Sequence, residues 1–175
     1  GPGKGALIYL RRTVTDKATG ELLCSLASTT FCRADGGFGG PSGPAPAPHA
    51  LPDRPCDLSC DLPTLPQAAL IYRLCGDRNP LHVDPAIAKA AGFPRPILHG
   101  LCTFGVAGHA LLKTLCAYDA ARMKRMQVRF SAPVFPGETI RTEIWRESKG
   151  RASFRCQVPE RNAVVLNNGT LEYLA

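Results

Sequence analysis

Alternating apolar and polar residues mark two strands near the start of the chain. The segments ALIYLRRTVTD, from residue 6, and ELLCSLASTTFC, from residue 21, are rich in β-branched and apolar side chains, and a short turn ending in Gly20 separates them. We therefore predict a β-hairpin within residues 1–32. Because two strands alone bury too little apolar surface to be stable, we expect this hairpin to join a larger sheet.

A stretch dense in glycine and proline follows the hairpin. It reads GGFGGPSGPAPAPHALPDRP over residues 36–55, and these residue types disfavour both a strand ladder and a helix. We predict a mobile linker here, with a domain boundary inside it. His49 lies in this stretch, and we expect its side chain to be solvated.

Helical signals come next. The segment LPQAALIYRLC predicts a short helix with Pro66 at its start and Gly76 at its end. A proline inside residues 77–82 prevents helical continuation, so this stretch is expected to be an irregular loop. Residues 84–92, DPAIAKAAG, then predict a second short helix with Asp84 as its N-cap.

The longest apolar segment predicts a buried helix. It reads GLCTFGVAGHALLKTLCAY over residues 100–118, is apolar nearly all round, and has no Asp or Glu between Leu101 and Cys116. Gly105 and Gly108 each lower helix stability by about 0.5 to 1 kcal/mol relative to alanine, which suggests that another group approaches the backbone closely there. We interpret His109, in the same segment, as a hydrogen-bonded core histidine.

From Met123 onward the pattern changes to that of strands. Four runs, MQVRFSAPVF, TIRTEIWRES, ASFRCQVPE and VVLNNGTLEYL, are separated by short turns with residues such as PGE and KGR. A long helix followed by an antiparallel meander predicts an α+β fold in which the sheet covers the helix.

Charge narrows the classes of ligand. There are 21 Lys and Arg against 14 Asp and Glu, a formal net charge of +7 that favours an anionic ligand. The basic residues are dispersed and have no interleaved aromatic residues, so we predict a small anionic ligand and no nucleic acid. No stretch approaches the roughly 18 to 20 apolar residues of a membrane-spanning helix, and we expect no membrane association.

The eight cysteines show no C-x-x-C pair and no histidine at zinc-ligand spacing. Most lie in apolar segments, where a free thiol behaves as a small hydrophobic group. We therefore expect reduced thiols and a cytoplasmic protein. The peroxisome is the alternative, although the final residues EYLA match no C-terminal targeting signal.

One region gathers the residue types that carry chemistry. Asp77 and His82 lie in the segment GDRNPLH, on a loop made rigid by proline, and the two side chains could hold one water between them. Gly100 precedes the long helix, where its backbone N–H can meet negative charge on a ligand. Two alternatives remain open for the loop: its polar residues could simply form turns and caps, or Asp77, His82 and Asp84 could bind a metal. Asp84 has a better use as a cap, so we predict no metal and no cofactor.

The segments GDRNPLH and PRPILHGLCTFG resemble the signature of MaoC-like (R)-specific enoyl-CoA hydratases. The resemblance implies a hotdog fold, an antiparallel sheet wrapped around a long central helix. It also implies syn hydration of a trans-2-enoyl-CoA to the (3R)-hydroxyacyl-CoA, with Asp77 and His82 as the catalytic pair, Asn79 orienting them, and the Gly100 amide as oxyanion donor. We expect further contacts with the acyl-CoA from the neighbouring residues Leu81, His99, Leu101, Phe104 and Gly105.

The N-terminal part resembles the end of the first repeat in two-repeat members of this family, on the segment STTFCRADGGFGG. The resulting division is residues 1–35 as a hairpin of a first repeat, 36–55 as linker and 56–175 as the catalytic hotdog domain. A lone hotdog sheet usually pairs, so we expect a homodimer or a two-repeat unit. Two rival functions remain, a hotdog acyl-CoA thioesterase and a non-catalytic acyl-CoA-binding domain. The CoA phosphates would meet basic residues, with Arg95 and Lys124 as candidates by position.

Overall fold

The computed structural model describes residues 3–41 and 43–175. By its internal contacts the chain forms two compact units, Gly1–Pro46 and Ala47–Ala175. No helix in the described residues is long and apolar enough to cross a membrane.

The first unit contains the predicted hairpin. Strand β1 (Ala6–Thr15) pairs antiparallel with β2 (Leu22–Cys32), and the turn between them is held by Asp16, whose carboxylate accepts hydrogen bonds from two backbone amides. Nearly every residue of both strands is exposed. In the described residues the hairpin is a two-stranded sheet of its own. Our expectation that it joins a larger sheet is therefore not met in this chain.

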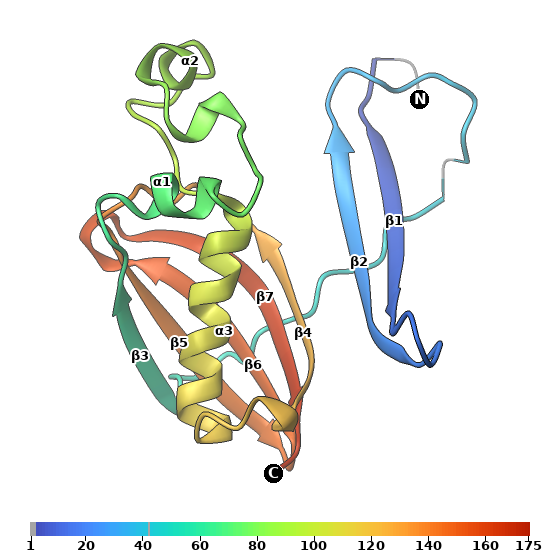
Figure 1. Cartoon of the computed structure of the whole chain (residues 1–175), viewed down its shortest axis with the longest axis vertical. Helices are drawn as coiled ribbons and strands as arrows, with labels where there is room; N and C mark the ends of the chain where they lie inside the picture. The colour runs from blue at the N-terminus through green and yellow to red at the C-terminus, as the bar shows by residue number, and fades with distance from the viewer. Residues whose placement is uncertain (1–2, 42) are drawn as a thin grey trace. The chain divides into compact units, whose positions relative to one another are not determined.

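The second unit is the expected hotdog fold. Five antiparallel strands form one sheet, and the long helix α3 (Gly100–Cys116) lies across one face of it, as Figure 1 shows. In sheet order the strands are β3 (Leu58–Pro63), β5 (Thr139–Ser148), β6 (Arg151–Val158), β7 (Ala163–Tyr173) and β4 (Met123–Phe130). The predicted α+β class is confirmed, and β5, β6 and β7 form the predicted antiparallel meander. The expected place of the run from Met123 in that meander is wrong, because β4 pairs with β7 and not with β5.

The core lies between α3 and the sheet. Its largest fully buried side chains come from both layers: Leu111 of α3 and Ile140, Ile144, Phe154, Leu166 and Leu171 of the strands. Because successive side chains alternate across a strand, Ala152, Phe154 and Cys156 of β6 face this core while Ser153 faces the opposite side of the sheet. Burial raises the pKa of the Cys156 thiol to about 12, so it stays protonated.

Short helices connect the strands, close to where the sequence predicts them. Helix α1 is Ala68–Arg73 and α2 is Pro85–Ala90, and both are shorter than predicted. The predicted N-cap of α2 is confirmed, because Asp84 Oδ1 accepts from Ala86 N at 2.8 Å. The described part of the chain also has three single turns of 3-10 helix: η1 (Pro80–His82), η2 (Ala120–Arg122) and η3 (Pro159–Arg161).

The prediction that α3 is enclosed on all sides is wrong for this chain. The sheet covers one side of α3, while Leu101, Gly105 and His109 lie on an exposed side, with Leu101 64 % exposed. The interpretation of His109 as a core histidine is therefore also wrong; its ring lies 5.7 Å from that of Tyr118. The close backbone approach expected at the two helix glycines is absent among the described residues: nothing lies within 4 Å of a Cβ built at Gly105, and Met126 Sδ lies at an ordinary 3.6 Å from one at Gly108.

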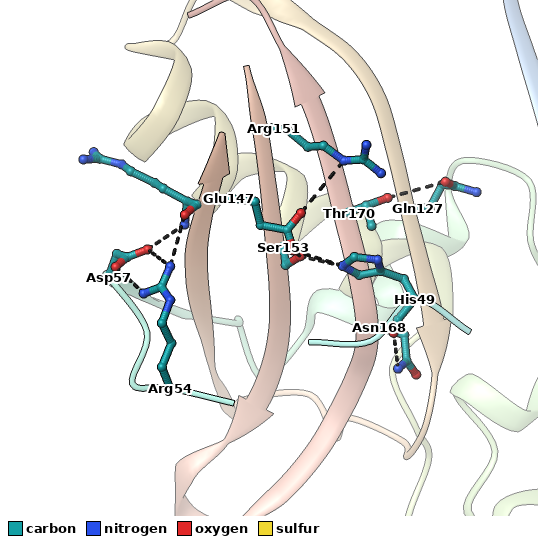
Figure 2. A network of polar contacts seen from close by, with 10 residues as sticks. His49, Arg54, Asp57, Gln127, Glu147, Arg151, Ser153, Asn168 and Thr170 are labelled. Carbon is teal, nitrogen blue, oxygen red and sulfur yellow. Dashed lines mark hydrogen bonds and ion pairs between the residues drawn. The ribbon is translucent and has the colours of Figure 1, made fainter. Parts of the chain in front are cut away.

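The expectation that His49 is solvated is wrong as well. Its Nε2 lies 2.6 Å from the hydroxyl of Ser153, and its carbonyl accepts a hydrogen bond from Asn168 Nδ2 at 2.7 Å. The Ser153 hydroxyl also donates to Glu147 at 2.5 Å, so one buried hydroxyl joins the histidine to a carboxylate (Figure 2). The segment around His49 is thus fastened to the face of the sheet opposite α3.

The next residues of the predicted linker are also held in place. The Trp145 indole donates to the Arg54 carbonyl at 2.7 Å, and the Arg54 guanidinium pairs with Asp57 (Figure 2). Asp57 also accepts from the Arg146 amide at 2.6 Å. These hydrogen bonds, from Arg54 first, lower the pKa of Asp57 to about 2. Proline in this stretch therefore prevents regular secondary structure without preventing attachment to the sheet.

Candidate active site

The loop after α1 is built by its own polar side chains. Asn79 Oδ1 accepts from the Leu81 amide at 3.0 Å and so caps η1, and the Asn79 amide donates to Asp77 Oδ1 at 3.2 Å. Pro80 fills the first position of η1, where a missing N–H costs nothing. The irregular loop that we predicted therefore ends in a single helical turn. Asn79 thus holds the Asp77 carboxylate with its backbone amide and the start of η1 with its side chain.

The ring of His82 is fixed by a backbone carbonyl. His82 Nδ1 lies 2.8 Å from Ile97 O, and a carbonyl oxygen can only accept a hydrogen bond. Nδ1 therefore carries the proton of the neutral ring, and Nε2 keeps its lone pair. The half-buried His82 is in this way prepared to act as a base through Nε2.

Three titratable side chains meet here. Asp77, His82 and His99 each offer a ligand atom, and these atoms lie within 4.8 Å of one another. Such spacing could hold a metal ion, and it equally lets one water bridge two of the groups, since two hydrogen bonds of about 2.8 Å span about 5.5 Å. Asp84, which we considered as a ligand from the sequence, is instead bonded to the first amides of α2.

Gly100 begins α3, and no side chain of the N-cap residue occupies the backbone amides at the helix start. His99 is the N-cap residue but makes no side-chain cap, so the first amides of α3 are left for another acceptor. Gly100 is exposed, and a Cβ at this position would lie 3.3 Å from the Phe130 ring. Glycine therefore keeps the N–H accessible beside an aromatic side chain.

His82 and Gly100 open into the same cavity, of about 350 Å³. The remaining lining is mostly apolar and comes from the loop before α3, from α3 itself, from the end of β4 and its following loop, and from β7: Phe93, Ile97, Leu98, Thr103, Phe130, Ser131, Ala132, Pro133, Val134 and Val165. A cavity with a base and a backbone donor at apolar walls suits a small acyl group with one polar end.

The structure places the five residues that we expected to contact the acyl-CoA outside the lining of this cavity, and their contact with the ligand stays a prediction. None of the five lines this cavity: Leu101 and Gly105 are exposed, Leu81 and Phe104 are half-buried, and His99 is only 1 % exposed. The sequence reasoning missed the walls formed by the segments FPRPI and FSAPV. The only sequence signal in these two segments is a proline next to apolar residues. Proline prevents a regular strand or helix there, which leaves the apolar side chains available to line a cavity.

The two basic candidates for CoA phosphates differ. Arg95 donates to the Pro136 carbonyl at 3.0 Å and its guanidinium lies 4.8 Å from the centre of the Phe135 ring, so much of its bonding capacity is used within the fold. Lys124, at the start of β4, is exposed. Neither residue lines the cavity, so both stay predictions for a CoA phosphate.

Comparison with known proteins agrees with this geometry. Residues 48–167 match the family described as MaoC like domain. The chain is 49 % identical over 180 residues to 3-hydroxyacyl-thioester dehydratase Y of Mycobacterium tuberculosis, which covers 100 % of this chain and 62 % of that protein. It is 45 % identical to the protein named enoyl-CoA hydratase 2, peroxisomal, of Arabidopsis thaliana, covering 94 % of this chain and 56 % of that protein.

A solved structure shows the same fold. The crystal structure of a MaoC-like dehydratase from Phytophthora capsici superposes with a TM-score of 0.89 at 44 % identity, over 98 % of this chain and 57 % of that one. The chain thus spans about six-tenths of the length of the relatives it matches. With the family match over most of its length and a hotdog sheet around α3, this chain belongs to the MaoC-like dehydratase family.

Proposed function

We propose that this chain carries the active site of an (R)-specific enoyl-CoA hydratase, which adds water reversibly to a trans-2-enoyl-CoA. Asp77 and His82 are the catalytic pair, the Gly100 amide is the oxyanion donor, and Asn79 positions the loop. The relatives named as enoyl-CoA hydratases support the reaction class. The residue roles rest on the geometry of the loop and of the start of α3.

One observation carries the proposal. The cavity of about 350 Å³ is lined both by His82, whose Nε2 is left free as a base, and by Gly100, whose amide has no cap. Asp77 lies within 4.8 Å of the His82 ligand atom, close enough for a shared water. A base and an oxyanion donor thus line one largely apolar cavity, and the exposed Asp77 lies beside the base, outside the cavity lining.

The reaction needs each of these parts. Water adds its hydroxyl to C3 and a proton to C2, and negative charge builds on the thioester oxygen as the C3–O bond forms. The Gly100 amide, at the positive end of α3, stabilises that charge; one such donor typically lowers the barrier by about 3 kcal/mol. Because Asp77 and His82 hold the same water, hydroxyl and proton reach one face of the double bond, which gives syn addition. The (3R) configuration is a separate part of the proposal, because it depends on which face of the double bond meets the pair.

The two rivals make different demands on the site. A hotdog thioesterase would draw on a carboxylate from the central helix, and residues 100–116 contain no Asp or Glu. A non-catalytic acyl-CoA-binding domain would have no need for a histidine at the cavity wall whose Nε2 keeps its lone pair. Hydration is therefore the reaction that uses all the groups present.

Crotonyl-CoA is the substrate for the test. Hydration removes the absorbance of the conjugated enoyl thioester and produces (3R)-hydroxybutyryl-CoA, which chiral chromatography identifies. Release of free CoA thiol would favour the thioesterase, and binding without any product would favour the acyl-CoA-binding domain. Either result contradicts the proposal.

The working unit is also a proposal, because the chain spans about six-tenths of its relatives. We propose that residues 56–175 are the catalytic hotdog domain, that 1–35 are the end of a first repeat, and that a second hotdog unit completes the assembly as a partner repeat or a second copy. Light scattering after size-exclusion chromatography distinguishes a monomer of 18.7 kDa from a dimer. The cytoplasm remains the expected compartment, and the peroxisome the alternative given the name of the Arabidopsis relative.

A further inference from the structure

We propose that His99 is a positioning residue for the hydratase site. Its buried ring stacks on the ring of His82 and bonds to the backbone carbonyl of Asp77, and it does not touch the substrate. This inference rests on the proposed function above. It revises our expectation that His99 contacts the acyl-CoA.

The contact with His82 is a ring stack. The centroids of the two imidazoles lie 3.7 Å apart with 27° between their planes. Together with the hydrogen bond from His82 Nδ1 to Ile97 O, the stack determines both the tilt and the rotation of the His82 ring. The two contacts therefore fix the direction in which the lone pair on His82 Nε2 points.

The contact with Asp77 runs through the backbone. His99 Nε2 lies 3.3 Å from the Asp77 carbonyl oxygen, which can only accept, so Nε2 carries the ring proton and donates it. This bond joins the start of the catalytic loop to the residue immediately before Gly100. One side chain thereby links the positions of Asp77, His82 and the oxyanion donor.

The ring of His99 is also buried and neutral. His99 is 1 % exposed and lies against Tyr72 at 4.6 Å between centroids, and its Nδ1 has no hydrogen-bond partner among the described residues. Burial, and then the neighbouring His82, lower the pKa of His99 below its ordinary value. A neutral ring at this place adds no positive charge beneath a His82 that must accept a proton.

Two substitutions separate the two contacts. His99→Phe keeps a flat ring for the stack but removes the N–H that reaches Asp77, whereas His99→Gln keeps a terminal N–H and removes the ring. A misplacement of catalytic groups by about 1 Å can lower the rate 100-fold, so we expect each variant to lose about tenfold to 100-fold in kcat for crotonyl-CoA hydration, with KM changed less than about threefold. His109→Ala, on the exposed side of α3, is the matched control and should retain the wild-type rate.

A second readout does not depend on turnover. In ¹⁵N NMR spectra of the imidazoles, both variants should change the tautomer populations of His82, while His109→Ala leaves them unchanged. A KM that rises with unchanged kcat would place His99 in the substrate site and overturn the inference, as would variants with wild-type kcat and wild-type His82 signals. A wild-type protein without hydratase activity would contradict the proposed function alone, and the His82 signals would still decide the role of His99.

Discussion

His82 donates its Nδ1 proton to the carbonyl of Ile97 over 2.8 Å, and this one bond decides which nitrogen of the ring can act as a base. Ile97 follows the two prolines of FPRPI, which bring its carbonyl to the catalytic loop from a different segment. The chemistry of the loop thus depends on a backbone group fifteen residues away along the chain.

His82→Ala should remove most of the turnover. General acid–base groups typically contribute 10² to 10⁴ in rate, so we expect kcat for crotonyl-CoA hydration to fall by roughly that factor. His109→Ala is the matched histidine control, because its side chain is exposed on α3. Steady-state kinetics on both variants provides the measurement. A fully active His82→Ala enzyme would show that His82 is structural and not catalytic.

Gly100→Ala should impair the oxyanion donor without unfolding the protein. The added Cβ would lie 3.3 Å from the Phe130 ring, which must move, and the amide beside it shifts with the helix start. We expect kcat to fall by at least about tenfold and by at most the roughly 10² to 10³ that the complete loss of an oxyanion donor typically costs.

Gly108→Ala is the control for the same change in the same helix. Its Cβ would have ordinary contact with Met126 at 3.6 Å, so activity should be retained and the helix should gain about 0.5 to 1 kcal/mol of stability. Equal losses of kcat in the two glycine variants would show a general effect on α3 and would count against the role of Gly100.

The buried His99 should make the protein less stable in mild acid. Its pKa is lowered from 6.5 in the fold, chiefly by burial and then by His82, with Arg73 adding to and Asp77 opposing the shift. The unfolded chain therefore binds a proton that the folded chain rejects, and stability falls as the pH drops below about 6.5.

Urea unfolding at about pH 7.5 and about pH 5.5 measures this difference. In His99→Phe, which cannot titrate at this position, the loss of unfolding free energy between the two pH values should be smaller than in the wild type. The exposed His109→Ala should keep the wild-type loss. An unchanged loss in His99→Phe would mean that His99 is protonated in the fold as readily as in the unfolded chain.

His49→Ala should loosen the segment that precedes β3. The substitution removes the bond to Ser153, while Ser153 keeps Glu147 as acceptor, so we expect a loss of about 0.5 to 1.5 kcal/mol in the free energy of unfolding. Cleavage within residues 47–57 by a protease should become faster, with crotonyl-CoA turnover unchanged. The exposed Asp53→Ala, in the same segment, is the control, and equal cleavage of all three proteins would refute the anchoring role of His49.

Local signals explain what the sequence could predict. Asp84 followed by proline, the loop GDRNPLH and the change to a strand pattern after Met123 are each encoded within a few residues. The structure confirms the cap and the strands, and it shows a loop that ends in one helical turn, whereas the pairing of β4 with β7 had no local signal. Contacts between distant segments had no such signal. The attachment of His49 to Ser153 joins residues 104 positions apart, and a proline-rich composition describes a mobile and a fastened segment equally well.

The same reason explains the misread faces of α3 and the missed cavity walls. An apolar helix has one pattern whether one side or every side is covered, so the exposure of Leu101 and His109 could not be read from residues 100–118. Phe130 and Val134 belong to the cavity only because the end of β4 passes the start of α3. The linear spacing of Asp77 and His82 alone left the role of the pair open, and His99 was expected to contact the ligand; the stacking of the His99 ring on His82 required the fold.

The shared water of Asp77 and His82 is tested most directly by hydrating crotonyl-CoA in D₂O. Hydroxyl at C3 and deuterium at C2 should reach the same face of the double bond, so NMR of the product should show the single diastereomer of syn addition with (3R) configuration. Anti addition, or a mixture of diastereomers at C2 early in the reaction, would contradict the account, because two groups that hold one water between them can serve only one face.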